Sequence, residues 1–409
     1  MNSQKLVRNI PLFYIYQSLN SFILDRGIWM LFLLSRDFTL AEIALIESAY
    51  HGVIFILEVP TGYIADRFGK RTSLLLAQLI GLVSGSFLLW GDNGITIVIG
   101  FLLGALVGTL QSGATSAMIY ETLLQLGKEI AFKKHNSMLT ALMLVTMSLS
   151  GLTGGVLSDI SWGWVYGGKI MLHVITLMVV LLLIEPHIHQ ESSAKGKTVA
   201  FPFFRQMIEI YRFMSMNAAF VTLSLYGAVL FSMAWSLTFF SQVVFQLIGL
   251  SNSTIGLLNG IETWIGAGFA AIAFIGERYI GKRGSLLVSG SGFVVCLFTF
   301  SISGNPIVLI SAFFLVSVCI SYIEPLLEAY LNELIPSHLR ATMLSVFGMM
   351  VSSGMMITFT IIGFLADATS LPNALQKWII FWIPLFAVVF FAAFRRGVLV
   401  QRQRSNRPE

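Results

Sequence analysis

Long, uninterrupted apolar segments constrain this chain more than any other feature of its sequence. Hydrophobic residues make up 56% of its 409 residues and charged residues only 11%, whereas a soluble domain carries roughly 25% charged residues. A chain of this composition needs a lipid bilayer as solvent, and a helix crosses the bilayer with about 20 apolar residues. The apolar segments are continuous rather than alternating, which excludes a transmembrane β-barrel. The sequence therefore predicts an all-α integral membrane protein.

Hydropathy predicts twelve transmembrane spans, and the distribution of charge agrees with that number. The spans are expected near residues 10–34, 41–64, 73–91, 96–122, 136–158, 164–186, 217–247, 254–276, 285–303, 306–332, 342–366 and 376–395. Most Lys and Arg residues fall in alternate connections, and the opposite side carries only Arg36, Lys169 and Lys377. Because positive residues stay on the cytoplasmic side, both termini are expected there. Ile10 begins a full-length span, so no cleavable signal is expected.

The longest polar stretch, residues 187–206, divides the spans into two sets of six. This division predicts an N-terminal six-helix bundle over 1–186, a cytoplasmic linker over 187–216, a C-terminal six-helix bundle over 217–395 and a basic cytoplasmic tail over 396–409. Within the linker, Phe203–Met214 is amphipathic, and we expect an interfacial helix there. The simpler alternative is that this segment only leads into span 7.

The two halves of the chain also resemble each other in sequence. Asp66–Arg71 has a degraded copy in Glu277–Arg283, and Gly154–Asp159 has a copy in Gly363–Asp367. The copies follow at offsets of 211 residues (277 − 66) and 208 residues (367 − 159). Parallel repeats of this kind predict two bundles related by an axis along the membrane normal.

One short polar loop joins the second and third predicted spans. It has the sequence Gly62-Tyr-Ile-Ala-Asp66-Arg67-Phe-Gly69-Lys70-Arg71. One acid and three cations between two apolar spans place this loop at the water interface. Its spacing resembles the loop between helices 2 and 3 of major facilitator superfamily transporters, and the resemblance extends over the whole chain. It implies two six-helix bundles in a pseudo-twofold arrangement and transport by alternating access.

In that superfamily the aspartate of the motif lies against the start of helix 11 and helps to close the cytoplasmic side. The resemblance implies this role for Asp66, with Arg340 and Thr342 at the start of span 11. We expect Thr342 to cap that helix. The residues implied in this conformational gate are Gly62, Asp66, Arg67, Gly69, Lys70, Arg71 and Arg340.

Within the superfamily the chain looks most like the bacterial drug- and metabolite-exporting proton antiporters. The segment Glu58-Val-Pro60-Thr-Gly62 and the membrane acid Asp25 carry this similarity. Two features depart from it: the predicted span 4 has no arginine, and Gly151-Leu-Thr-Gly154-Gly155 lacks the proline of the span 5 motif. The resemblance implies a monomer in the bacterial inner membrane. It also implies export of a small amphiphilic compound, such as a drug, siderophore or metabolite, in exchange for protons.

Polar residues inside the spans indicate where a substrate or a proton binds, because they are costly in lipid and usually face a partner or a wet cavity. On a continuous helix over 10–34, the side chains of Tyr14, Ser18, Ser21 and Asp25 share one face. Glu262 lies 211 residues after His51 (262 − 51), so the two are expected at equivalent places in the two bundles, where structural hydrogen bonding is the alternative role. Histidine titrates near neutral pH, which suits a proton-coupled step. The candidate substrate- or proton-binding residues are Asp25, His51, Glu262, Glu324, Tyr14, Ser21 and Asn259.

Other classes of function lack support in the sequence. It shows no nucleotide-binding loop, catalytic triad or metal-binding cluster, so we expect no enzymatic activity, no cofactor, no metal and no nucleic-acid partner. Cys296 and Cys319 fall in different spans and form no disulfide framework. Protons are therefore the expected coupling ion and a small molecule the expected substrate.

Two alternatives to an exporter stay open at this point. One is an importer or a lipid flippase on the same scaffold. The other is a membrane receptor or scaffold that transports nothing, which is disfavoured because the chain has no sizeable soluble domain. The acids at positions 25, 262 and 324 favour a cationic or neutral substrate.

Overall fold

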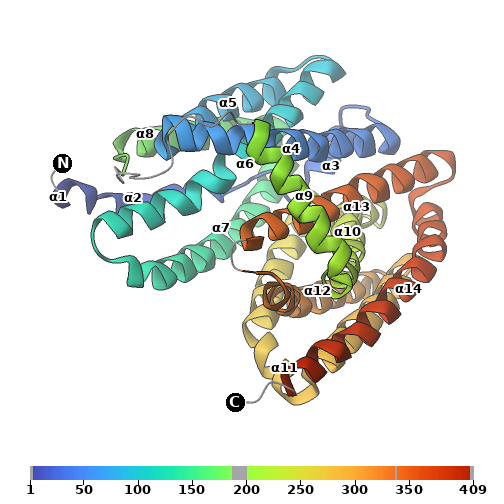
Figure 1. Ribbon diagram of the computed structural model, residues 1–409. Coiled ribbons are helices and arrows are strands. Elements are labelled where there is room, and N and C mark those ends of the chain that lie inside the picture. Colours follow the sequence, from blue (N-terminus) through green and yellow to red (C-terminus); the bar gives the residue numbers. More distant parts are fainter. Residues whose placement is uncertain (1–2, 187–199, 337–338, 406–409) are drawn as a thin grey trace. The chain divides into compact units, whose positions relative to one another are not determined.

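The computed structural model describes residues 3–186, 200–336 and 339–405 (Figure 1). This part of the chain contains no strand. Its helices are α1 (Ser3–Leu6), α2 (Asn9–Asn20), α3 (Trp29–Leu34), α4 (Leu40–Phe68), α5 (Lys70–Trp90), α6 (Gly94–Gln125), η1 (Glu129–Ala131), α7 (Phe132–Ile160), α8 (Trp162–Leu182), α9 (Ala200–Met216), α10 (Ala218–Leu247), α11 (Asn252–Ile302), α12 (Pro306–Leu334), α13 (Arg340–Ala368) and α14 (Leu371–Ser405). The predicted all-α membrane fold is confirmed.

Ten helices of the described chain are long and apolar enough to cross a membrane. One of them, α11, has 51 residues and contains two spans, because Gly281 interrupts it with a φ of 69° and a ψ of 172°. The helices α2 and α3, with 12 and 6 residues, together cover the first predicted span. The described chain therefore accounts for the twelve crossings that hydropathy predicts.

The first predicted span is not a continuous helix. α2 ends at Asn20, and α3 begins only at Trp29. The helical phase that aligned Tyr14 with Ser21 and Asp25 ends before the last two, so the prediction of one polar stripe along 10–34 is wrong. Hydropathy measures composition over a window and does not detect such a change of backbone conformation.

Contacts with α7 hold this interruption in place. Within it the backbone turns tightly, and the Arg26 N–H donates to the Ile23 carbonyl at 3.2 Å. Non-helical backbone at membrane depth persists only where the protein satisfies its polar groups, and the Ser150 hydroxyl of α7 also donates to the Ile23 carbonyl, at 3.2 Å. A Cβ at Gly154 would lie 1.8 Å from the Leu24 carbonyl oxygen. The bare glycine of α7 therefore makes room for the open backbone.

The described chain forms two compact units. The first comprises the described residues up to 186 together with Gln242–Trp264, and the second comprises the described residues from 200 to 241 and from 265 onward. The predicted division into bundles over 1–186 and 217–395 stays a prediction. The helix predicted over 203–214 lies within α9, whereas residues 187–199 of the predicted linker lie outside the described residues.

The first unit is built around the packing of α5 with α6 and α8, of α4 with α6, and of α2 with α7 and α8. Its apolar core includes Phe13, Tyr16, Leu74, Met118 and Val180, which come from four of these helices. Small polar side chains join the helices where they approach: the Ser73 hydroxyl donates to the Leu110 carbonyl at 2.7 Å. Such bonds suit a lipid setting, where burial of apolar surface does not drive helices together.

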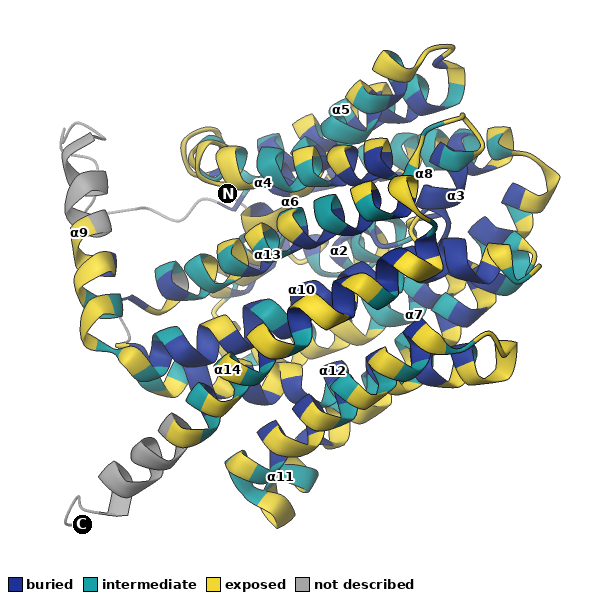
Figure 2. Cartoon of the chain, turned by 90° about the vertical axis from the view of Figure 1, so that its right-hand side faces the viewer, coloured by how far each residue is buried: buried dark blue, intermediate teal, exposed yellow. Residues whose placement is uncertain are grey.

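The outward surfaces of the helices are apolar. Ile56 and Val59 of α4 are 69% and 67% exposed, and Phe381 of α14 is 81% exposed. Figure 2 shows exposed residues alternating with buried ones along single helices. A soluble protein would not leave so many large apolar side chains exposed, which agrees with a chain that lies in lipid.

Candidate functional site

The polar segment Gly62–Arg71, predicted as a loop, instead forms the end of α4 and the start of α5, with a sharp turn between these two long helices. α4 ends at Phe68 and α5 begins at Lys70, with only Gly69 between them. Gly69 has a φ of 98° and a ψ of 151°. Residues with a Cβ disfavour this conformation, whereas glycine adopts it readily. The predicted gate glycine is therefore required by the backbone of the turn.

Glu185 caps the beginning of α5, which the sequence analysis missed. The backbone N–H groups of Lys70 and Arg71 donate to its two carboxylate oxygens, each at 2.7 Å. An anion at a helix N-terminus satisfies free N–H groups and opposes the positive end of the helix dipole. Asn9 holds the neighbouring Ile184 through bonds of 2.7 and 2.9 Å, which positions this acid.

The cations of the motif make further contacts within the first unit. The Arg71 guanidinium donates to the carbonyls of Val180 and Leu181, at 3.2 and 2.6 Å. It thereby satisfies two backbone carbonyl groups at the C-terminal end of α8. Lys70 pairs with Asp66, one helical turn earlier. Glu121 of α6 lies within electrostatic range of both. The motif thus belongs to a charge network that joins neighbouring ends of α4, α5, α6 and α8.

We expect Glu185→Ala to lower the free energy of unfolding by about 0.5–2 kcal/mol, the usual cost of losing a helix cap. Glu185→Gln, which keeps one acceptor oxygen, should cost less. The measurement is the thermal unfolding midpoint of the purified protein in detergent, with Glu129→Gln on the exposed turn η1 as control. Equal midpoints for Glu185→Ala and the control would refute the capping role.

The degraded copy of the motif has the same backbone feature. Gly281 also has a positive φ, 69°, and it separates the two halves of α11 as Gly69 separates α4 from α5. In the second unit, Lys282 pairs with Glu333 at 2.6 Å and lies 4.6 Å from the centre of the Tyr330 ring. The two glycines support the internal repeat that the sequence predicts.

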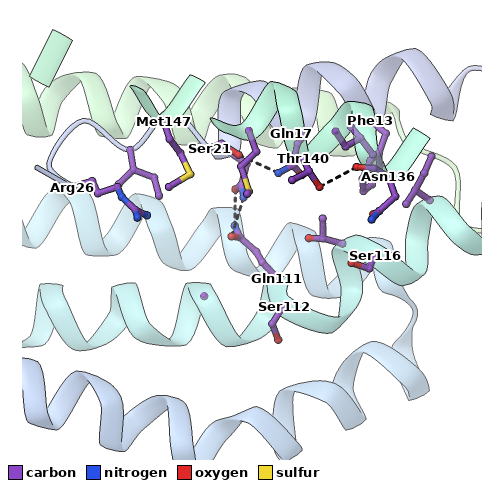
Figure 3. A pocket seen from close by; sticks show the side chains of 17 residues that line it. Phe13, Gln17, Ser21, Arg26, Gln111, Ser112, Ser116, Asn136, Thr140 and Met147 are labelled. Carbon is purple, nitrogen blue, oxygen red and sulfur yellow. Dashed lines mark hydrogen bonds between the residues drawn. The ribbon is translucent and has the colours of Figure 1, made fainter. Parts of the chain in front are cut away.

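A cavity of about 520 Å³ lies within the first unit, among α2, the interruption after it, α6 and α7 (Figure 3). Its lining is largely amide, hydroxyl and apolar side chains, and Arg26 is its one ionisable residue among the described chain. The residues that line it are Phe13, Gln17, Asn20, Ser21, Ile23, Arg26, Gly108, Gln111, Ser112, Thr115, Ser116, Ile119, Asn136, Leu139, Thr140, Met143 and Met147. Pockets of this volume bind small molecules.

A chain of hydrogen bonds connects the cavity wall to α8. Asn20 and Gln111 bond reciprocally through their amides, at 3.1 and 2.8 Å. Gln78 of α5 donates to the Asn20 carbonyl oxygen at 3.4 Å, and its own oxygen lies 2.8 Å from Nδ1 of His173. The His173 ring packs directly over Gly81, where a Cβ would lie 2.3 Å from the ring.

Asp25 is buried in an ion pair that the sequence analysis did not predict. Its Oδ2 lies 2.7 Å from Nζ of Lys169, and the two side chains are 7% and 21% exposed. Lys169 lies within α8, inside the predicted span over 164–186. A lysine inside a span needs an acidic partner. This rule, applied to Lys169 in the predicted span over 164–186, could have indicated such a pair from the sequence.

The other candidate residues lie at separate places. Of the seven, only Ser21 lines the cavity. Tyr14 bonds to His135 at 2.9 Å, and Nε2 of His51 lies 3.4 Å from Glu47 one turn earlier. Asn259 bonds within α11 to the Ile255 carbonyl at 2.9 Å. The roles proposed for these residues stay predictions.

The two remaining candidate acids, Glu262 and Glu324, each lie near another charged group. Glu262 lies within electrostatic range of Arg26. Glu324, in the second unit, is exposed and lies one turn from Glu328 on α12. Neither lines the cavity, and no other described aspartate or glutamate does so.

The beginning of α13 differs from the prediction. The helix starts at Arg340, and Leu339 occupies the capping position without a side-chain hydrogen bond. Thr342 therefore lies inside the first turn and does not cap the helix, because the helix begins two residues earlier than the predicted span. Arg340 itself is exposed.

Glycines bring α7 and the first part of α11 into close contact within the first unit. A Cβ at Gly256 would lie 2.2 Å from the Gly151 carbonyl oxygen, and one at Gly155 would lie 2.5 Å from the Asn252 carbonyl oxygen. At the end of this crossing the Asp159 carboxylate accepts the Asn252 N–H at 3.1 Å and thereby caps α11. The segment Gly151–Gly155 thus serves close helix packing without the missing proline.

Comparison with known proteins identifies the family. The sequence profile of the Major Facilitator Superfamily matches residues 10–283 and 244–408. YxaM of Bacillus subtilis strain 168, described as an uncharacterized MFS-type transporter, is 20% identical over 382 residues, which cover 88% of this chain and 90% of the relative.

Solved structures of transporters share the fold. A bacterial homologue of the human lysosomal transporter Spinster, inward-facing and unoccupied, gives a TM-score of 0.74 at 14% identity and covers 96% of this chain and 98% of its own. The nucleoside transporter NupG gives 0.71 at 13% identity with coverages of 96% and 99%. A D-xylose–proton symporter gives 0.70 at 14% identity with coverages of 95% and 96%. With the profile match over most of the sequence, the chain belongs to the Major Facilitator Superfamily of multi-pass membrane transporters.

Proposed function

We propose that this carrier exports a small amphiphilic compound in exchange for protons, as a monomer in a bacterial inner membrane with both termini cytoplasmic. The cavity of the first unit carries the proposal, because its volume of about 520 Å³ suits a small organic molecule. Its wall combines amides and hydroxyls with apolar side chains such as Phe13, Met143 and Met147. An amphiphilic compound matches both kinds of surface. The similarity of Glu58–Gly62 and Asp25 to the drug- and metabolite-exporting antiporters favours export.

Charged groups near the cavity support proton coupling. Asp25, which pairs with Lys169, directly precedes Arg26 in the sequence, and Glu262 is within electrostatic range of Arg26, which lines the cavity. A proton taken up by either carboxylate changes the net charge beside the cavity by one. Because a net charge inside a membrane protein is costly, binding of substrate and binding of a proton should influence each other. Asp66 and the rest of the Gly62–Arg71 loop are proposed to control closure of the cytoplasmic side.

Proton-coupled uptake is the second candidate. A D-xylose–proton symporter has the same fold, and the cavity chemistry suits uptake as well as export.

The test uses everted membrane vesicles, an imposed pH gradient and a panel of labelled compounds. We expect Glu262→Gln to abolish accumulation driven by the pH gradient while exchange of substrate across the membrane continues. Glu129→Gln, on an exposed turn, should behave like the unaltered protein. Normal gradient-driven accumulation by Glu262→Gln, and also by a folded variant without the Asp25 carboxylate, would rule out these acids as the coupling groups.

A further inference from the structure

We propose that the cavity of the first unit binds an organic anion, with the carboxylate or phosphate of the substrate at Arg26 and its polar body against the amides of Asn20 and Gln111. This inference rests on the proposed function, because it names the class of compound that the carrier moves. It reverses the preference for a cationic or neutral substrate that the acids in the sequence suggest.

The charge of the cavity wall is the first argument. Among the described residues that line the cavity there is no aspartate, glutamate, lysine or histidine, and Arg26 is the one charged side chain. The wall itself therefore carries one positive charge, and Glu262, which lies within electrostatic range of Arg26, is not part of the wall. A cationic group would enter against this charge, whereas an anionic group would be attracted to it.

The neighbouring residues 25 and 26 face different surroundings. Asp25 is buried and bonds to Lys169 of α8 at 2.7 Å, so its negative charge is neutralised away from the cavity. Arg26 is one of the side chains that line the cavity (Figure 3). The interruption between α2 and α3 makes this possible, because the chain turns there instead of continuing as a helix. The acid that indicated a cationic substrate is thus not part of the wall.

The Arg26 guanidinium has the properties of an anion-binding group. Arg26 is exposed, and its side chain lines the cavity. None of the ion pairs within 4 Å among the described residues involves it. A guanidinium binds carboxylate and phosphate in a bidentate manner. An anionic substrate would give this cation an ion-pair partner within 4 Å.

The amides of the wall are held in place before a substrate arrives. The bonds between Asn20 and Gln111 use one N–H of each amide group, and each group has two. Gln78 and His173 fix the pair from behind. A preorganised donor costs less to order on binding. The second N–H groups of this pair suit hydroxyl, carbonyl or further anionic oxygens of the substrate.

The remaining surface is apolar and adaptable. Phe13, Ile119, Leu139, Met143 and Met147 complete the lining. Methionine fills irregular spaces and tolerates different partners. The cavity therefore fits an organic anion with an apolar part better than inorganic phosphate.

The experiment measures binding to the purified full chain in nanodiscs of neutral lipid at constant ionic strength. The probes share an aromatic ring and differ in their charge or hydroxyl group: phenylacetate, mandelate, phenyl phosphate, benzyl alcohol and benzylammonium. We expect the three anions to raise the unfolding midpoint in a saturable manner and benzylammonium to leave it unchanged. Arg26→Gln should weaken binding of the anions at least about tenfold, because hydrogen bonds to charged groups are the stronger ones.

Matched variants separate the cavity from other cationic surfaces. Arg36→Gln removes a cation that stacks on Phe32 and does not line the cavity, and it should leave anion binding unchanged. Arg26→Lys keeps the charge and should retain part of the binding. Gln111→Leu keeps Arg26 and should remove the preference for mandelate, which carries a hydroxyl, over phenylacetate. This variant tests the proposal even where Arg26→Gln fails to fold.

Three results would overturn the proposal. They are stabilisation by benzylammonium equal to that by the anions, unchanged anion binding in Arg26→Gln, and no stabilisation by any anion up to its solubility limit. Binding is measured without any gradient, so the outcome is independent of proton coupling. Export of a cationic compound in the vesicle assay would support the proposed function and contradict this inference. Anion binding without gradient-driven flux would support this inference and contradict the proposed function.

Discussion

Asp25→Asn should destabilise the protein by about 3–5 kcal/mol, the cost of leaving the partner of a buried ion pair without its countercharge. The asparagine has nearly the same shape, so packing is kept. Lys169 would then hold an ammonium that is only 21% exposed inside α8. Lys169→Gln should cost a similar amount, because it leaves the Asp25 carboxylate, 7% exposed, unpaired. The measurement is the unfolding midpoint of each purified variant in the same detergent.

The double variant Asp25→Asn with Lys169→Gln provides the control. It removes both charges at once, and an uncharged pair can hydrogen-bond across the same gap, so it should be more stable than either single variant. A double-mutant cycle isolates this coupling. If the two single effects simply add, the ion pair is not a unit and the prediction fails.

This result also bears on the transport assay. Asp25→Asn alone loses stability as well as a carboxylate, so loss of flux in that variant does not identify a proton-binding site. The neutral double variant lacks the carboxylate but keeps a balanced interior. It is therefore the suitable variant for testing whether Asp25 takes part in proton coupling.

Gly256→Ala should destabilise the protein by about 1–3 kcal/mol, the usual cost of overfilling a packed site. The added Cβ would lie 2.2 Å from the backbone oxygen of Gly151. A backbone atom cannot move aside as a flexible side chain does, so α7 and α11 must separate. Ser148, whose hydroxyl donates to the Gly260 carbonyl at 2.9 Å, would lose part of that contact.

Gly268→Ala on the same helix is the matched control. No heavy atom lies within 4 Å of a Cβ built at Gly268, so alanine should stabilise the helix by up to about 1 kcal/mol. The two variants thus have the same chemical change and opposite expected signs. Comparison of their unfolding midpoints decides the matter, and a decrease of equal size in both would show that close packing at Gly256 is not the cause.

The candidate site could be predicted only in part, and the reason lies in sequence distance. Ser21 was found because polar residues inside a span are conspicuous. Asp25 was found for the same reason, but its partner lies 144 residues away on α8. Glu185 likewise caps a helix whose first residue lies 115 residues earlier. Pairings over such distances depend on how helices pack, and a single sequence contains no direct record of packing.

The cavity residues Asn20, Gln111 and Arg26 were also not predicted from the sequence. An amide within a predicted span is neither rare nor strongly polar, so it gives a weak signal. Arg26 follows Asp25 directly, and on a continuous helix its side chain would point about 100° away from that of Asp25. The interruption at residues 21–28 changes its direction, and that interruption depends on Ser150 and Gly154 of α7.

The sequence by itself determined the solvent and the all-helical class, because the length of an apolar segment is a local property of the chain. It did not determine the break between α2 and α3. It also identified the family through the Gly62–Arg71 loop, whose glycine is required by one backbone turn. Only the tertiary structure decided which charges are neutralised and which face the cavity. A charge buried in a helix bundle takes its role from the nearest side chain of another helix, and the bundle brings that side chain close only when it is assembled.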